Sequence, residues 1–177
     1  MEKIKSVKIK SVTVDYRKWT SGRLRHRGKF CILGFVAKEA GVPEKYMSEV
    51  SRLNSLHYCE GLENLPEFLG KTVKQRKSSE LLDPVFREKN GIVSKILEYN
   101  DNAVYIANPP LRMALLYKLF KENKIKLVFE NVPPEIMTEF RSLCRSKKKL
   151  ESAKKKAKNQ EEWYCDLKDV KKNKKLQ

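Results

Sequence analysis

The spacing of apolar residues changes along this chain, and each spacing predicts a different kind of element. Between residues 7 and 16, apolar side chains such as Val12 and Val14 alternate with polar ones, with a slip near Lys10. A period of two is typical of a half-buried strand. The same period returns at 125–129. We therefore predict a small sheet of two or three strands that contains both segments.

Longer apolar periods between these segments predict helices. Residues 30–40 are apolar on most sides and are followed by Gly41, which predicts a buried helix that ends there. Asn108 followed by Pro109 is a helix-start signal, and an apolar stripe continues from it to Phe120. The helix that begins at Pro109 is the clearest in the sequence.

Four further predictions rest on shorter patterns. A helix is expected to begin at Pro43, the basic segment 71–77 is expected to be a surface loop, and Asp83–Pro84 is expected to begin another helix. Residues 100–102, Asn-Asp-Asn, are expected to form a turn. Together these elements predict an α+β fold, with a mainly helical compact body and a small sheet.

Beyond Pro134 the pattern changes to one apolar residue every seven positions. This period predicts one long helix with a narrow apolar seam, which projects from the body as a basic extension. We expect a compact domain at 1–132, a lysine-rich helical extension at 133–167 and a disordered tail at 168–177. The seam consists of Ile136, Leu143, Leu150, Ala157 and Tyr164.

The positive charge of the chain lies at its two ends. Residues 1–30 hold ten Lys/Arg and two acids, and residues 141–177 hold fourteen and five, so that the ends carry +8 and +9. Residues 31–140 are neutral, and the ends therefore account for the whole net charge of +17. A neutral body with two basic ends favours an anionic partner, nucleic acid foremost.

The two basic regions differ in composition. The first mixes arginines with Trp19, a pattern that suits RNA as well as DNA. The second is dominated by lysine, which favours point-charge contacts with phosphates over reading of bases. We predict that both contact nucleic acid, through Arg17, Lys18, Arg23, Arg25, Arg27 and Lys29 in the first, and Arg145, Lys147, Lys148, Lys149, Lys154, Lys155, Lys156 and Lys158 in the second.

Each basic region also has a simpler interpretation. Trp19 follows a strand and is expected to be a core residue more readily than a platform for a base. The lysines alternatively keep the protein soluble or contact an acidic protein surface. The three arginines in the loop between Gly22 and Gly28 are harder to explain in this way, because a solvated loop does not need so many cations.

Other chemistries find little support in the sequence. No apolar run approaches the roughly 20 residues of a membrane span, and no hydrophobic export signal follows Met1. The four cysteines are widely spaced, so we expect reduced thiols, with Cys31 inert in an apolar setting. His57 and Cys59 lack a second pair that would complete a zinc site. We expect no metal, no cofactor and no enzymatic activity. An enzyme that uses Cys59 and His57 is the alternative that the sequence favours least.

Five motifs follow one another along residues 17–130: Lys18–Trp19 with Gly22, Gly-Lys-Phe-Cys-Ile-Leu-Gly-Phe at 28–35, Asn100–Asp101, the helix from Arg112 to Phe120, and the strand from Ile125 to Phe129. In these motifs and their order the sequence resembles a group of small uncharacterised proteins of bacteriophages and prophages. The chain departs from the group at Ile32, where a second cysteine usually stands. The resemblance implies a viral or mobile-element origin and a compact body that recurs with other tails; no activity comes with it.

The sequence thus leads to two functional hypotheses. The first is a phage-encoded, non-enzymatic nucleic-acid-binding protein in the cytoplasm of the infected host cell, with RNA or a ribonucleoprotein favoured over DNA. The second is a host-takeover or anti-defence inhibitor that binds a host protein or complex that processes nucleic acid. Both leave the oligomeric state open.

Overall fold

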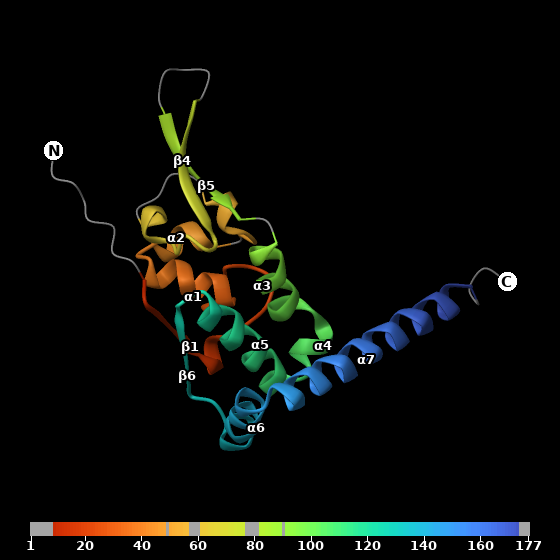
Figure 1. Ribbon diagram of the computed structural model, residues 1–177. Coiled ribbons are helices and arrows are strands. Elements are labelled where there is room, and N and C mark those ends of the chain that lie inside the picture. The colour runs from red at the N-terminus through yellow and green to blue at the C-terminus, as the bar shows by residue number, and fades with distance from the viewer. Residues whose placement is uncertain (1–8, 49, 57–60, 77–81, 90, 174–177) are drawn as a thin grey trace.

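A computed structural model describes residues 9–48, 50–56, 61–76, 82–89 and 91–173 (Figure 1). The protein has the predicted α+β fold, with three two-stranded sheets beside the helices. The strands are β1 (Ser11–Asp15), β2 (Arg25–His26), β3 (Lys29–Phe30), β4 (Gly70–Arg76), β5 (Leu82–Glu88) and β6 (Lys126–Glu130). The helices are α1 (Ile32–Glu39), α2 (Glu44–Met47), α3 (Ile92–Asp101), α4 (Ala103–Ile106), α5 (Pro109–Glu122), α6 (Pro134–Arg145) and α7 (Lys147–Asn173), with short 3-10 helices η1 (Tyr16–Lys18), η2 (Leu53–Ser55) and η3 (Leu62–Asn64).

The two strands that the alternating pattern predicted pair with each other. β1 and β6 are parallel, with Val12 opposite Leu127 and Val14 opposite Phe129. All four side chains are buried, whereas their neighbours along the strands are more exposed. The prediction of a sheet that joins the opening strand to 125–129 is confirmed, because each strand turns its apolar positions toward one core.

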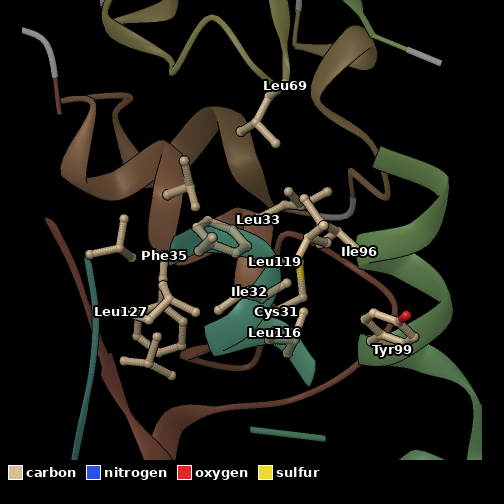
Figure 2. Close-up of a cluster of buried hydrophobic side chains, with 14 of the residues drawn as sticks. Cys31, Ile32, Leu33, Phe35, Leu69, Ile96, Tyr99, Leu116, Leu119 and Leu127 are labelled. Atoms are coloured by element: carbon tan, nitrogen blue, oxygen red, sulfur yellow. The ribbon is translucent and has the colours of Figure 1, made fainter. Parts of the chain in front are cut away.

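Helix α1 lies at the centre of the core. Its N-cap is Cys31, whose sulfur accepts a hydrogen bond from the Gly34 amide at 3.4 Å. A Cβ at Gly34 would lie only 1.8 Å from the carbonyl oxygen of Leu24, so a glycine is required where the helix meets this segment. Figure 2 shows Ile32, Leu33 and Phe35 of α1 in one cluster with side chains from other elements, among them Ile96, Leu116, Leu119 and Leu127.

The segment around β4 and β5 differs from the prediction. Residues 70–76 form a strand and not a surface loop, and Asp83 and Pro84 lie inside strand β5 and do not begin a helix. The two strands form an antiparallel hairpin in which Phe86 is buried. Proline is tolerated because each strand of a two-stranded sheet is an edge, where one side of the backbone needs no partner. Lys77 lies outside the described residues.

Two of the predicted helix starts have different outcomes. Asn108 caps α5 as predicted, because its side-chain oxygen accepts a hydrogen bond from the Leu111 amide at 3.2 Å. The helix expected from Pro43 is a single turn that ends at Met47. The turn predicted at residues 100–102 instead ends α3, and Asn102 then caps α4.

The C-terminal region consists of two helices and not one. The chain breaks at Ser146, whose backbone is extended (φ −127°, ψ 105°), so that α7 packs back on α6. Leu143, Leu150 and Ala157 of the predicted seam are buried against the core, so α6 and the first part of α7 belong to the body. The side chain of Tyr164 lies outside those described. Helix α7 then projects past the body (Figure 1) and continues to Asn173, beyond residue 167.

No helix in the described part of the chain combines the length and the apolar character that a membrane crossing needs.

Candidate nucleic-acid interface

A buried polar cluster anchors the basic N-terminal segment to the body. The Trp19 indole Nε1 donates a hydrogen bond to Asn100 Oδ1 at 2.8 Å, and Arg112 Nη2 donates to the same oxygen at 2.9 Å. Arg112 Nη2 also donates to the Thr20 carbonyl oxygen at 2.9 Å. The Arg112 guanidinium lies over the Trp19 ring, with Cζ 3.8 Å from its centroid. Trp19 is therefore a core residue, as the simpler interpretation held, and its ring is not free to receive a base.

The charge of Arg112 is buried but retained. Burial lowers the pKa of Arg112 to about 10, while the nearby Asp101 carboxylate opposes this shift. Asp101 in turn accepts hydrogen bonds from the Gly22 amide at 2.8 Å and from the Asn100 side chain. A pKa of about 10 leaves the guanidinium cationic at neutral pH, so Arg112 keeps its positive charge beside the Asp101 carboxylate.

A pocket of about 670 Å³ opens beside this cluster, between η1, β3, the junction of α4 and α5, and the segment after β6. Arg112 lines it together with two of the predicted cations, Arg17 and Lys29. Tyr16 and Trp19 are among its aromatic lining residues. The structure thus brings Arg17 and Lys29 together with a third cation that the sequence analysis did not select.

Asp15 partly offsets the charge of Arg17. Its carboxylate lies 3.5 Å from Arg17 Nε and accepts hydrogen bonds from the Arg17 amide and from Asn131 Nδ2. Burial alone would raise the pKa of Asp15, but these hydrogen bonds outweigh it and hold that pKa below its ordinary value. The Arg17 side chain remains 70% exposed, so its guanidinium can still reach a ligand.

Two further predicted cations, Arg25 and Arg27, lie in the hairpin that β2 and β3 form. Arg27 and Gly28 both have positive φ, 49° and 75°, as the two central residues of a tight type I′ turn require. Arg25 is half-buried, with its Nε 3.0 Å from Glu44 Oε2, so its charge is already paired within the protein. Lys18, Arg23 and Arg27 are exposed.

Between residues 147 and 158, where the side chains of α7 are described, most lysines are exposed. Two of these lysines contact the protein: Lys154 Nζ donates to Tyr99 OH at 3.1 Å and Lys149 Nζ donates to Ser142 Oγ at 3.1 Å. The hydrogen bond with Tyr99 raises the pKa of Lys154. Arg145 is also exposed. The other predicted cations of this region, all exposed, are Lys147, Lys148, Lys155, Lys156 and Lys158.

Helix α4 lies between the two cationic regions. Its last residue, Ile106, lines the pocket, while α7 packs against α4 (Figure 1). Helix α4 therefore contributes one residue to the pocket and also contacts α7. Ile106 itself is 39% exposed, one of the few large apolar side chains at the surface of the described residues.

The cysteines provide no nucleophile in the described core. Cys31 is fully buried, and burial raises its pKa to about 12, which keeps the thiol protonated and inert. His57 and Cys59, the candidate pair of the enzyme hypothesis, lie outside the described residues. Among the side chains that the structure describes, no three His, Cys, Asp or Glu residues are grouped so that they could hold a metal ion.

Arg112 and Asn100 are the site residues that the sequence analysis missed. Arg112 was treated as the first residue of an apolar helix motif, and Asn100 as part of a turn. The available signal was a single arginine within an otherwise apolar helical stretch, since a charge there needs a buried partner. Its partners come from Trp19 and Thr20, which are remote in sequence and were not predictable from spacing.

Comparison of the chain with models of known protein families, with curated proteins and with solved structures found no match.

Proposed function

We propose that this protein is a phage-encoded, non-enzymatic nucleic-acid-binding protein that contacts phosphates through α7 and through the exposed cations of its N-terminal segment. One observation carries the proposal. Lys147, Lys148, Lys155, Lys156 and Lys158 are exposed, and among the described side chains none of them has a carboxylate partner. The one acidic residue of α7 whose side chain is described, Glu151, pairs with Lys118 of α5 at 3.6 Å.

The form of α7 suits a polyanion. At about 1.5 Å per residue, its 27 residues extend roughly 40 Å. Lys148 and Lys155 are seven residues apart and therefore lie about 10 Å apart on nearly the same side. Leu150 and Ala157 are buried against the body, so the lysines on the opposite side of the helix point away from the core. The helix backbone that carries them is already in place before a ligand binds. Lysines in this arrangement contact the backbone of a strand without reading its sequence.

RNA, alone or in a ribonucleoprotein, is favoured over duplex DNA. Two cations of the N-terminal segment, Arg17 and Lys29, line the pocket together with Tyr16, and a mixture of arginine and aromatic groups fits unpaired or irregular strands. The resemblance to bacteriophage and prophage proteins supports a phage origin, so the proposed place of action is the cytoplasm of the infected cell.

Binding of labelled single-stranded RNA and of duplex DNA of equal length tests the proposal by fluorescence anisotropy. The test variant replaces Lys147, Lys148, Lys155, Lys156 and Lys158 with glutamine. The control variant replaces five exposed lysines elsewhere, so that its net charge is the same: Lys10, Lys71, Lys89, Lys95 and Lys126. We expect the α7 variant to lose at least tenfold in RNA affinity, and the control to lose less than threefold.

Equal losses in the two variants would show that only net charge matters and would overturn the proposal. A different result would favour the inhibitor hypothesis over nucleic-acid binding. In that result the wild-type protein binds neither RNA nor DNA, and tagged protein recovered from infected cells retains a host protein after nuclease treatment.

A further inference from the structure

The pocket beside Trp19 has features that the proposed contacts of α7 do not explain. Its volume of about 670 Å³ falls in the range of small-molecule sites. Arg17, Lys29 and Arg112 line it, and none of its lining residues is acidic. Asp15 and Asp101 offset part of the charge of Arg17 and Arg112, but the pocket surface itself is lined by cations and by no carboxylate, as an anion site is.

Arg112 gives this pocket a built cation. The residue is only 7% exposed, and two of its hydrogen bonds, to Thr20 and Asn100, use the same nitrogen, Nη2. Its Nε is buried and has no hydrogen-bond partner among the described residues. Within the described residues the side-chain hydrogen bonds of Arg112 use Nη2 alone, so the other terminal nitrogen, Nη1, has no acceptor in the protein and can donate to a ligand oxygen. Because the Trp19 contact fixes the guanidinium, a ligand would meet it already oriented.

The uncharged lining residues indicate what kind of chemical group the anionic ligand carries besides its phosphate. Ile106, Pro109, Val132 and Pro133 form an apolar part of the pocket, and Tyr16 adds an aromatic ring. Ile106 is 39% exposed and Tyr16 is half-buried, so both remain accessible to a ligand. A flat, partly apolar group joined to a phosphate matches a lining that is cationic on one part and apolar on the other.

We infer that this pocket binds a nucleoside 5′-monophosphate group, with the phosphate on Arg17, Lys29 and Arg112 and the base against Tyr16 and Ile106. Two kinds of ligand carry this group: a free mononucleotide and the 5′-phosphorylated end of an RNA strand. The inference goes beyond the proposed function, because the pocket can bind a mononucleotide whether or not α7 binds a polymer.

The first arm of the test uses a short RNA labelled at its 3′ end, with a 5′-phosphate or a 5′-hydroxyl, in anisotropy measurements. The second arm uses AMP and inorganic phosphate in calorimetry. The pocket variant is Lys29→Gln, which changes an exposed side chain and spares the buried cluster; its matched control is Lys95→Gln on α3, also exposed. Arg112→Lys is a second pocket variant, used after its circular dichroism spectrum shows that it folds.

A preference of fivefold or more for the phosphorylated RNA, reduced by Lys29→Gln and kept by Lys95→Gln, supports the inference with the strand end as source. Binding of AMP, weakened in the same way, supports it with the mononucleotide as source. Equal affinity for the two RNA ends together with no binding of AMP overturns it, and so does binding that Lys29→Gln and Arg112→Lys leave unchanged. If the pocket binds neither ligand but RNA binding still depends on the five α7 lysines, the inference is overturned and the proposed function stands. A loss of RNA binding in the five-lysine variant alone is evidence about α7 and not about the pocket.

Discussion

Arg112 and Trp19 are in direct contact, with the guanidinium carbon of Arg112 3.8 Å from the centroid of the Trp19 ring. The contact joins helix α5 to the segment between η1 and β2, and Asn100 of α3 bonds to both partners. Three separate parts of the chain therefore meet at one buried polar cluster. Because Arg112 also lines the pocket, the same residue stabilises the fold and presents a charge at the candidate site.

The first prediction concerns the stability of this cluster. Arg112→Met keeps an unbranched, largely apolar stem but removes the guanidinium, with its hydrogen bonds to Thr20 and Asn100 and its contact with the Trp19 ring. We expect the free energy of unfolding to fall by about 3 kcal/mol, since buried acceptors lose a charged donor. Arg112→Lys, which keeps the charge, is expected to lose less. Urea denaturation measures both, and a loss below about 1 kcal/mol in Arg112→Met contradicts this account of the cluster.

The second prediction contrasts two glycines. In Gly34→Ala the new Cβ would lie 1.8 Å from the backbone oxygen of Leu24, so helix α1 must shift. In Gly28→Ala the Cβ would meet nothing within 4 Å, and the cost is only that of a positive φ of 75°. We expect a loss of more than about 3 kcal/mol at Gly34, from overpacking, and of roughly 1 kcal/mol at Gly28. Thermal and urea unfolding of both variants check the order, and similar losses contradict it.

The sequence predicted the elements whose signal is local. The alternation at Val12 and Val14, the glycine after the first helix and the Asn108 cap each act over a few residues, and the structure contains the corresponding strand, helix end and cap. The strand β4 and the proline within β5 were missed because a two-stranded hairpin tolerates charged residues and a proline on its edges.

The candidate site was predictable only in part. The exposed lysines follow from composition, and the seven-residue seam correctly selected Leu150 and Ala157 as buried positions of α7. The break at Ser146 was not visible, because the seam continues through it without a change of period. The pocket depends on Arg112, Arg17 and Lys29 meeting across the fold, which no spacing along the chain encodes.

The third prediction concerns the salt dependence of RNA binding. A lysine that neutralises a phosphate of a single strand releases a counterion, with a slope of about 0.7 in log affinity against log salt concentration for each contact. Removal of the five exposed α7 lysines should therefore reduce the slope by up to about 3.5. Titrations between 50 and 300 mM salt, roughly the range in which such slopes are measured, test this. An unchanged slope would show that these lysines do not contact phosphates.

The fourth prediction concerns pH and Cys31. Its pKa is about 12 in the folded protein, raised from 9.0 by burial. Above pH 9.0 the thiol therefore ionises in the unfolded chain but not in the folded one, so the folded state binds more protons and stability falls as the pH rises toward 12. At one pH unit above the unfolded value, the loss from this group is about 1.4 kcal/mol.

Cys31→Ser removes the ionisation and keeps an oxygen that can accept a hydrogen bond from the Gly34 amide. The difference in free energy of unfolding between the two proteins should change by this amount between pH 8 and pH 10, about one unit either side of the unfolded pKa. Equal pH profiles would mean that the Cys31 thiol reaches solvent in the folded state.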